Sequence, residues 1–393
     1  MESSNNDFIP DEIDTYESFD IMNLKDEILR GIYAYGFEKP SPIQQKAIIP
    51  IIQKKDIIAQ AQSGTGKTGT FTISILQRIN FDEVNTQALI IVPTRELAQQ
   101  IQKVISSISI YCKIKVMSVI GGTDVRTDMN ILKDGVHIVV GTPGRIYDMI
   151  NREVLKLDKL KMLILDEADQ MLDRGFKDQI YEIFRKGLPN STQVALFSAT
   201  WTKESQEIAN KFMNNPTKIM VTKEKLTLEG IKQYKILLKK EEYKFSALYD
   251  LYKAISINQS IIYCNNRKKV EDLVANLAEQ KISMVCLHGD MPQSEREKIM
   301  KDFASGSARI LITTDLLARG IDVQQLSLVI NYDIPNNREN YIHRIGRTGR
   351  FGRKGVALNF ITEKDESLIN DIEQFYNTSI SELPDNIDVL LDV

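Results

Sequence analysis

The chain has 393 residues, of which 42% are hydrophobic and 26% are charged, and its formal net charge is −3. This length exceeds one ordinary α/β core and predicts two domains of about 200 residues each. The slightly acidic balance excludes binding to nucleic acid through a general positive field, so any such binding must depend on individually placed groups.

The beginning of the chain is acidic and rich in Ser and Asn, and we expect residues 1–18 to form a disordered tail. No signal peptide is apparent there, and no apolar run approaches the roughly 20 residues of a membrane span. The cysteines lack the spacing of a metal site and lie in apolar runs, which favours reduced thiols. They are Cys112, Cys264 and Cys286. We therefore expect a cytoplasmic protein without membrane attachment, with the nucleus as the alternative location.

Short apolar, β-rich runs alternate with helix-period stretches along the chain, a pattern typical of parallel sheets covered by helices. In the first half the predicted strands are residues 56–61, 87–93, 137–141, 161–165 and 193–197. In the second half they are residues 260–264, 284–287, 309–313, 326–331 and 355–360. Each half therefore supplies a sheet of its own.

A charged, weakly periodic stretch that contains Gly230 separates the halves, and it predicts a linker at residues 223–232. The predicted domains are accordingly residues 19–222 and residues 233–393. Small, polar or charged residues follow most of the predicted strands, and ligands of open α/β sheets bind outside the carboxyl ends of strands. The motifs therefore fall where ligands bind.

A P-loop follows the first predicted strand and precedes an apolar helical stretch. Its members are Ala61, Gln62, Ser63, Gly64, Thr65, Gly66, Lys67 and Thr68. Backbone amides of such a turn bind phosphate oxygens, the lysine reaches the β- and γ-phosphates, and the Thr68 hydroxyl ligates Mg²⁺. Ala61 stands where the general pattern has glycine, so the flanking strand and helix carry part of the assignment. The segment predicts an ATP-type nucleotide site.

Three acidic residues, Asp166, Glu167 and Asp169, directly follow the predicted strand at residues 161–165. We predict that Asp166 holds Mg²⁺ and that Glu167 orients an attacking water. The alternative is a solvated acidic helix start, which the helix dipole favours. The P-loop about a hundred residues earlier favours the catalytic interpretation.

Arginines recur every third residue near the end of the second half, at Arg344, Arg347 and Arg350. A helical turn would place them near one face, and the interleaved Gly346 and Gly349 indicate close approach to another surface. An arginine finger contributes about 10³- to 10⁵-fold to the rate of phosphoryl transfer. The alternative is a solvated basic face.

Together with Ser198-Ala199-Thr200, these motifs resemble the DEAD-box RNA helicases of superfamily 2, and the similarity runs from Phe19 to Thr362. The resemblance implies an α/β fold of two tandem RecA-like domains, each a mostly parallel sheet flanked by helices, joined by a short linker. It also implies an enzyme that hydrolyses ATP with Mg²⁺ and acts on RNA.

The same resemblance assigns roles to residues outside the motifs described so far. Phe37 would stack on adenine and Gln44 would pair with its edge, as ordinary base recognition allows. Asp322 would contact the ribose, Arg347 and Arg350 would be the arginine fingers, and Asp315 would support them. Asp169, Ser198, Thr200 and His343 would couple the nucleotide state to the surface between the domains.

The resemblance further implies an RNA-binding set made mostly of small or hydroxyl residues after predicted strands. Its members are Pro93, Thr94, Arg95, Gly122, Thr142, Arg145, Arg267, Gly289, Gln293, Arg296 and Thr313. Such residues suit contacts to phosphates and 2′-hydroxyls without reading of bases. Each of them alone could belong to an ordinary turn, so their collective order carries the assignment.

We expect single-stranded RNA to be bound without sequence specificity, duplexes to be unwound locally, and ATP hydrolysis to release the RNA. Residues 226–230, 313–325 and 340–343 resemble the translation initiation branch of the family, which implies scaffold proteins of the initiation machinery as partners of a chain that is monomeric alone. One alternative is an ATP-gated RNA clamp in an mRNA-marking assembly such as the exon junction complex. Another is a P-loop ATPase unrelated to nucleic acid.

Overall fold

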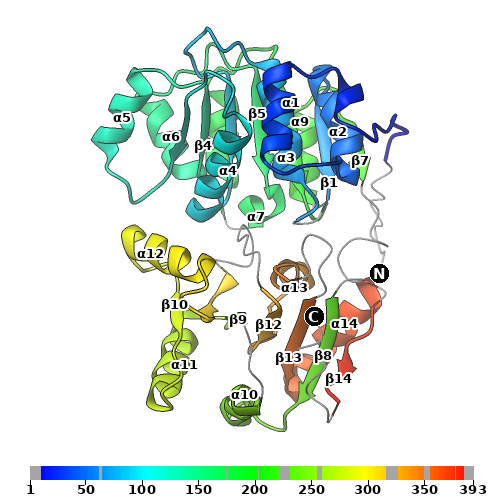
Figure 1. The fold of residues 1–393 in the computed structure, drawn as a ribbon, viewed down its shortest axis with the longest axis vertical. Helices are drawn as coiled ribbons and strands as arrows, with labels where there is room; N and C mark the ends of the chain where they lie inside the picture. The colour runs from blue at the N-terminus through cyan, green and yellow to red at the C-terminus, as the bar shows by residue number, and fades with distance from the viewer. Residues whose placement is uncertain are drawn as a thin grey trace. The chain divides into compact units, whose positions relative to one another are not determined.

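The computed structural model describes residues 10–61, 64–173, 175–201, 203–220, 231–254, 259–315, 326–348, 355–376 and 378–384. The chain divides into two compact units, Met1–Thr222 and Lys223–Val393 (Figure 1). Each unit has its own sheet and its own hydrophobic core. Among the described helices, none is both long enough and apolar enough to span a lipid bilayer.

The first unit is built on a seven-stranded sheet with the order β3-β4-β2-β5-β6-β1-β7, and neighbouring strands pair in parallel. The strands are β1 (Ile57–Gln60), β2 (Ala88–Ile91), β3 (Val116–Val119), β4 (Ile138–Gly141), β5 (Met162–Asp166), β6 (Gln193–Ser198) and β7 (Thr217–Met220). The central strands are buried on both faces, which explains their continuous apolar sequences.

Helices cover both faces of this sheet. One layer consists of α1 (Asp26–Ala34), α2 (Pro42–Ile52), α3 (Lys67–Arg78) and α4 (Arg95–Ile108), after the short 3-10 helix η1 (Asp20–Met22). The other consists of α5 (Val125–Lys133), α6 (Pro143–Asn151), α7 (Ala168–Asp173), α8 (Lys177–Arg185) and α9 (Lys203–Phe212). Because side chains alternate across a strand, Ile57 and Ala59 pack in the first layer while Ile58 packs in the second.

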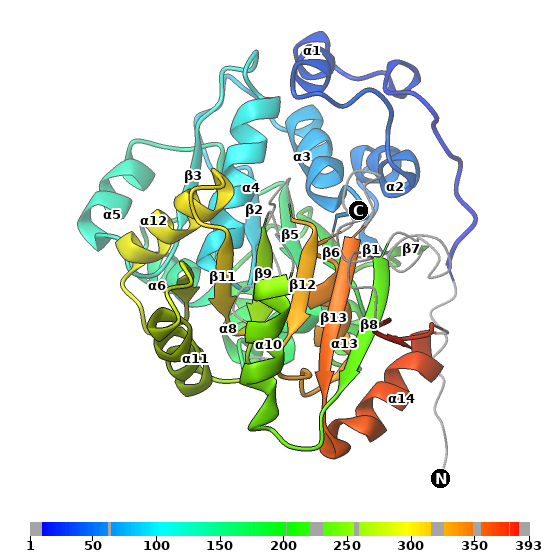
Figure 2. The ribbon, with the colours of Figure 1, turned by 60° about the horizontal axis from the view of Figure 1, so that its bottom comes forward.

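The second unit repeats this architecture with the strand order β10-β11-β9-β12-β13-β8-β14, again with parallel pairings (Figure 2). The strands are β8 (Ile231–Leu237), β9 (Ser260–Tyr263), β10 (Val285–Leu287), β11 (Ile310–Thr313), β12 (Leu328–Asn331), β13 (Gly355–Ile361) and β14 (Ser381–Glu382). The helices are α10 (Tyr243–Ala254), α11 (Arg267–Glu279), α12 (Gln293–Ala304), α13 (Arg338–Ile345) and α14 (Glu366–Tyr376), with the 3-10 helix η3 (Glu363–Asp365). The predicted fold class, two α/β units with parallel sheets flanked by helices, is confirmed.

All ten predicted strands are present, but the sequence patterns missed β3, β7, β8 and β14. β7 is an edge strand with a single buried residue, Ile219, and β8 carries Lys and Gln among its apolar residues. Strand β8 begins at Ile231, two residues inside the linker predicted at 223–232. Most of that linker lies outside the described residues.

The predicted disordered tail, residues 1–18, is too long. The backbone amide of Asp11 donates to the carbonyl of Lys218 at 2.9 Å, and that of Tyr16 donates to the carbonyl of Gln45 at 3.1 Å. Ile13 and Tyr16 also pack against the core of the first unit. Backbone bonds and two packed apolar residues therefore anchor the chain from residue 11 onward. The acidic composition of the whole segment predicted disorder because it outweighed these few apolar residues.

Candidate active site and nucleic-acid interface

The P-loop joins the end of β1 to the start of α3, which begins at Lys67. Gly64 and Gly66 have φ angles of +84° and +102°, a region that favours glycine. A Cβ atom on Gly66 would lie 2.5 Å from the Ser41 hydroxyl and 3.0 Å from Nε2 of Gln44, so the loop is seated closely on α2. Gln62 and Ser63 lie outside the described residues, as do Asp322 and Arg350.

The predicted lysine and carboxylates meet at one point. Nζ of Lys67 lies 3.2 Å from Oε1 of Glu167 and 3.7 Å from Oδ1 of Asp166. This proximity follows from the topology, because β1, β6 and β5 are parallel neighbours whose carboxyl ends share one edge of the sheet. Glu167 has a φ angle of +55°, a strained conformation of the kind concentrated at functional sites.

Burial and mutual attraction set the charges of this cluster. Burial opposes the charge of Lys67, but the carboxylates of Glu167 and Asp166 outweigh it and raise the pKa of Lys67. Burial raises the pKa of Asp166 to about 7, despite the nearby lysine. The Asp166 carboxylate and the Thr68 hydroxyl are oxygen donors of the class that Mg²⁺ prefers. A cation beside Asp166 would favour its ionised form.

Phe37 and Gln44 lie against the start of α3. The backbone amide of Ser41 donates to Oε1 of Gln44 at 2.8 Å, and Nε2 of Gln44 donates to the carbonyl of Gly66 at 3.4 Å. A Cβ on Gly69 would lie 2.5 Å from Nε2 of Gln44 and 2.9 Å from the Phe37 ring. The structure thus places an aromatic ring and an amide side by side next to the P-loop.

The first three residues of the predicted coupling set also meet. Oγ1 of Thr200 donates to Oδ2 of Asp169 at 2.6 Å, and the backbone amide of Asp169 donates to Oγ of Ser198 at 3.4 Å. These bonds tie the start of α7 to the end of β6. His343, the fourth member, lies on α13 of the second unit.

The predicted RNA-binding residues of the first unit follow the carboxyl ends of three neighbouring strands. Pro93, Thr94 and Arg95 follow β2, Gly122 follows β3, and Thr142 and Arg145 follow β4. Thr94 caps α4 by accepting from the amide of Leu97 at 3.3 Å. Arg145 pairs with Asp128 at 2.5 Å, so this arginine also ties α6 to α5.

The second unit places its members in the same way. Arg267 starts α11 after β9, Gly289 follows β10, Thr313 ends β11, and Gln293 and Arg296 lie on α12. Arg267 pairs with Glu271 at 2.7 Å and with Asp290 at 2.6 Å, whereas a Cβ on Gly289 would meet nothing within 4 Å. Backbone at Gly289 is therefore open to close approach by a ligand.

The arginine segment does not form the single helical turn that its spacing predicts. Helix α13 ends at Ile345, so Arg344 lies in its last turn, and Arg347 lies in a following turn where its amide donates to the carbonyl of Arg344 at 3.2 Å. The guanidinium of Arg344 bonds Asp315 and the backbone of its own unit. Nε of Arg347 donates to the carbonyl of His343 at 3.1 Å. Gly346 ends the helix and separates the two arginines structurally.

Sequence reasoning missed two polar residues that surround Arg344, Asn265 and Asp333. They are separated by 68 positions but follow the neighbouring strands β9 and β12. The available signal is a polar residue two positions after the end of each apolar strand.

Comparison with known families gives two matches that together span most of both units. The family described as DEAD/DEAH box helicase matches residues 41–208, and the family described as helicase conserved C-terminal domain matches residues 243–352. The chain is 58% identical to eukaryotic initiation factor 4A of Caenorhabditis elegans over 371 residues, covering 94% of this chain and 92% of that relative. It is 61% identical to the ATP-dependent RNA helicase eIF4A of Lodderomyces elongisporus over 369 residues, covering 94% and 93%.

Solved structures agree with these matches. The structure of S. cerevisiae Dbp5 bound to RNA and ADP BeF3 has a TM-score of 0.88 at 37% identity, covering 93% of this chain and 95% of that one. The structure of Mss116p bound to ssRNA and AMP-PNP has a TM-score of 0.86 at 31% identity, covering 95% and 81%. Both likenesses extend over the two units described above.

Proposed function

Because the chain belongs to the DEAD-box family of ATP-dependent RNA helicases, we propose that it binds single-stranded RNA without sequence specificity, unwinds duplexes locally and hydrolyses ATP to release the RNA. The observation that carries this proposal is the contact of Lys67 with Glu167 and Asp166 at the carboxyl ends of β1 and β5. A cation and two carboxylates, placed where a P-loop cradles phosphate, are the parts that phosphoryl transfer requires.

In this proposal the residues of the first unit bind and activate ATP. Lys67 exchanges its carboxylate partners for phosphate oxygens, and amides of residues 61–68 bind the remaining oxygens. Thr68 and Asp166 hold Mg²⁺, which neutralises developing charge on the phosphates when bound. Glu167 orients the attacking water. Phe37 stacks on adenine while Gln44 reads its edge.

The second unit supplies the arginines. Arg347 and Arg350 stabilise the charge of the transferring phosphoryl group, and Asp322 contacts the ribose. The bonds among Asp169, Ser198 and Thr200 give the acidic segment a fixed connection to the end of β6, and with His343 they transmit the nucleotide state to the RNA-binding residues.

RNA binding uses the open ends of both sheets. In the first unit the contacts are Pro93, Thr94, Arg95, Gly122, Thr142 and Arg145, and in the second they are Arg267, Gly289, Gln293, Arg296 and Thr313. The geometry supports this because the residues follow strands at one edge of each sheet. Hydroxyls, amides and guanidinium groups suit phosphates and 2′-hydroxyls, so base sequence goes unread.

We also propose a cytoplasmic role in translation initiation on mRNA, assisted by scaffold proteins of the initiation machinery. Its support is identity of 58% and 61% over 94% of the chain to relatives named as initiation factor 4A. A clamp that closes on RNA and turns over slowly would use the same residues, so the two functions must be separated by turnover.

The deciding experiment measures phosphate release with and without single-stranded RNA. We expect multiple turnovers that RNA accelerates, and we expect Glu167→Gln to abolish them, because glutamine keeps the shape of glutamate but cannot orient the water as a carboxylate does. Tight ATP-dependent retention of RNA with almost no turnover would instead establish the clamp. Equal rates with and without RNA would contradict an RNA-dependent enzyme.

A further inference from the structure

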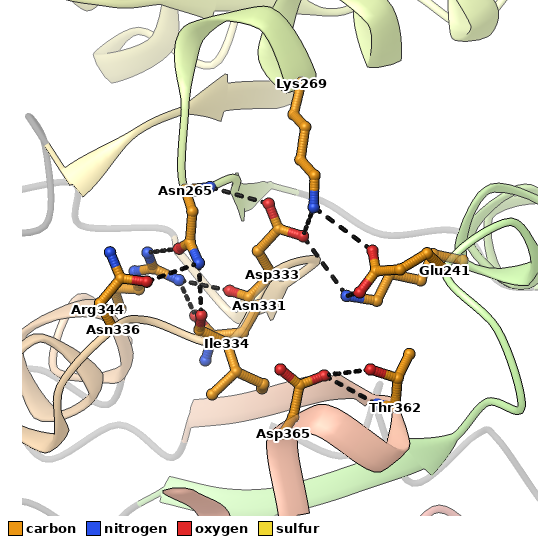
Figure 3. A network of polar contacts seen from close by, with 11 residues as sticks. Glu241, Asn265, Lys269, Asn331, Asp333, Ile334, Asn336, Arg344, Thr362 and Asp365 are labelled. Atoms are coloured by element: carbon orange, nitrogen blue, oxygen red, sulfur yellow. Dashed lines mark hydrogen bonds and ion pairs between the residues drawn. The ribbon is translucent and has the colours of Figure 1, made fainter.

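We propose that Asp333 and Asn265 are positioning residues for the arginine segment of the second unit. The Asn265 side chain and the backbone carbonyl of Asp333 both accept from the guanidinium of Arg344 (Figure 3). Asp315 accepts from the same guanidinium, and Arg344 in turn fixes the turn that carries Arg347. This inference rests on the proposed function, in which Arg347 acts on the transferring phosphoryl group.

Asp333 is the centre of the network. Its Oδ1 accepts from Nζ of Lys269 at 2.6 Å and from Nζ of Lys244 at 3.4 Å, while its Oδ2 accepts from the backbone amide of Asn265 at 2.9 Å. Glu241 accompanies both lysines, at 3.1 Å from Lys244 and 3.4 Å from Lys269. One carboxylate therefore binds the loop after β9 to helices α10 and α11.

Asn265 transmits this fixed position to the arginine. Its Oδ1 accepts from Nη2 of Arg344 at 2.8 Å, and its Nδ2 donates to the carbonyl of Ile334 at 2.7 Å. The side-chain amide of Asn265 accepts through its oxygen and donates through its nitrogen, so these two bonds fix its orientation. A rotation of this side chain would break both.

Arg344 has donors bonded in three directions. Nη1 donates to the carbonyl of Asp333 at 2.6 Å, and Nε donates to Oδ1 of Asp315 at 2.6 Å. Asp315 also accepts from Nδ2 of Asn340, one turn before Arg344 on α13. The planar fork of arginine is matched to this arrangement, which a point charge would not reproduce.

The bonded guanidinium sets the start of the next turn. The carbonyl of Arg344 accepts the amide of Arg347 at 3.2 Å, and the carbonyl of His343 accepts Nε of Arg347 at 3.1 Å. A shift of Arg344 therefore moves the backbone that holds Arg347. Misplacement of a catalytic group by about 1 Å can lower a rate about 100-fold, so the network bears on turnover rather than on nucleotide affinity.

The test compares steady-state ATPase kinetics at saturating RNA. Asp333→Asn should lower kcat about 10- to 100-fold. It should leave KM for ATP within about twofold, because Asp333 is not among the residues proposed to contact ATP before the reaction, which are Phe37, Gln44 and Lys67 in the first unit and Asp322 in the second. Lys269→Met, which removes only the half-exposed partner of Asp333, should give a smaller loss of the same kind. It keeps the test available if Asp333→Asn does not fold.

Tyr252→Phe is the matched control. It removes the 2.6 Å bond between the Tyr252 hydroxyl and Ser260, a partly buried polar contact of the same unit outside the network. If both variants lower thermal stability but kcat per folded molecule stays at the wild-type value for Asp333→Asn as well, the network is merely structural and the inference fails.

Arg347→Lys separates this failure from failure of the proposed function. If Arg347→Lys loses turnover while Asp333→Asn and Lys269→Met keep it, the positioning role is overturned and the role of Arg347 stands. If Arg347→Lys keeps wild-type turnover, the premise itself is overturned. A fall in kcat for both Arg347→Lys and Asp333→Asn, smaller for Asp333→Asn and with KM for ATP unchanged, supports both.

Discussion

The buried cations of the two units, Lys67 and Arg344, have different kinds of partners. In the first unit Lys67 pairs with Glu167 and Asp166, which are themselves assigned to the reaction, so the charges of the site neutralise one another until a ligand replaces them. In the second unit Arg344 is bonded to Asp315, Asn265 and the backbone of Asp333, which belong to the scaffold. Lys67 can exchange its carboxylate partners for those of a ligand, whereas the bonds of Arg344 keep the local backbone in place.

This difference predicts a division of labour between binding and turnover. Changes at the Lys67 cluster should alter both the affinity for ATP and the rate of hydrolysis. Changes around Arg344 and Arg347 should alter the rate alone. The variants that follow test that division.

The largest effect is expected for Arg347→Lys. We expect kcat to fall about 10³-fold or more, because an ammonium does not reproduce the planar fork that stabilises a transferring phosphoryl group. Equilibrium binding of a fluorescent ATP analogue should be unchanged. Weakened binding of the analogue would show that Arg347 contributes to affinity and would contradict the expected difference between the two cations.

Lys67→Ala should lower turnover about 10²- to 10³-fold, the scale of losing one electrostatic stabiliser. Unlike Arg347→Lys, it should also weaken nucleotide binding, since Lys67 is the cation that phosphate oxygens would contact. Circular dichroism should show an intact fold, and a normal rate would refute the assigned role. Loss of turnover with unchanged affinity would make the two units alike.

Gly69→Ala should act on affinity with little effect on kcat. The added methyl group would displace the Gln44 amide and press on the Phe37 ring, both of which lie within 3 Å of its position. We expect KM for ATP to rise several-fold while the phosphate-binding parts are retained. GTP serves as the internal control, because its KM should change less. Equal changes for both nucleotides would show that the loop, rather than the base contact, is disturbed.

The smallest effect concerns stability in acid. Burial opposes ionisation of Asp333, but the Asn265 amide, Lys269 and Lys244 outweigh it and lower the pKa of Asp333 below the ordinary 3.8. This contribution to folding is therefore present above about pH 4 and is lost as the pH falls through the folded-state pKa. Asp333→Asn should lower stability by about 2 kcal/mol near pH 7.

Thermal unfolding of both proteins across this range measures the difference. The difference in free energy of unfolding between wild type and Asp333→Asn should become smaller as the pH falls below about 4. A difference in free energy of unfolding that stays constant with pH would mean that the charge of the Asp333 carboxylate contributes nothing to stability.

Sequence patterns predicted the parts of the fold that burial makes uniform. Strand β5 is buried at every position, so its apolar run and the acids after it were readable. Strand β8 alternates buried and exposed residues only at its start and lies in a charged stretch, so its pattern resembled a linker. Ile231 of β8 is buried in one cluster with Ile361 of β13 and with apolar residues of α13 and α14. These contacts exist only in the folded chain, so no local sequence pattern indicates them.

The same reasoning divides the site. Lys67 and Glu167 were predictable because Lys67 follows a glycine-containing phosphate-binding turn and Glu167 directly follows β5, and the structure brings them to 3.2 Å. Arg344 was grouped with Arg347 by spacing alone, although the two have different partners. Asn265 and Asp333 carry only the general signal of a polar residue shortly after an apolar strand, and their contacts to Arg344 form only when the neighbouring strands β9 and β12 are paired.

The bonds at Lys218 have a consequence for the behaviour of the protein at high concentration. Both backbone groups of this residue are directed to Asp11, the carbonyl accepting its amide and the amide donating to its carboxylate at 2.8 Å. Since β7 is the last strand of its sheet, Asp11 blocks the open hydrogen-bonding edge at that point. An unprotected strand edge is a template for pairing with another molecule. We therefore expect removal of Asp11 to expose this part of the strand edge and to favour association at high concentration, without altering the residues assigned to the reaction.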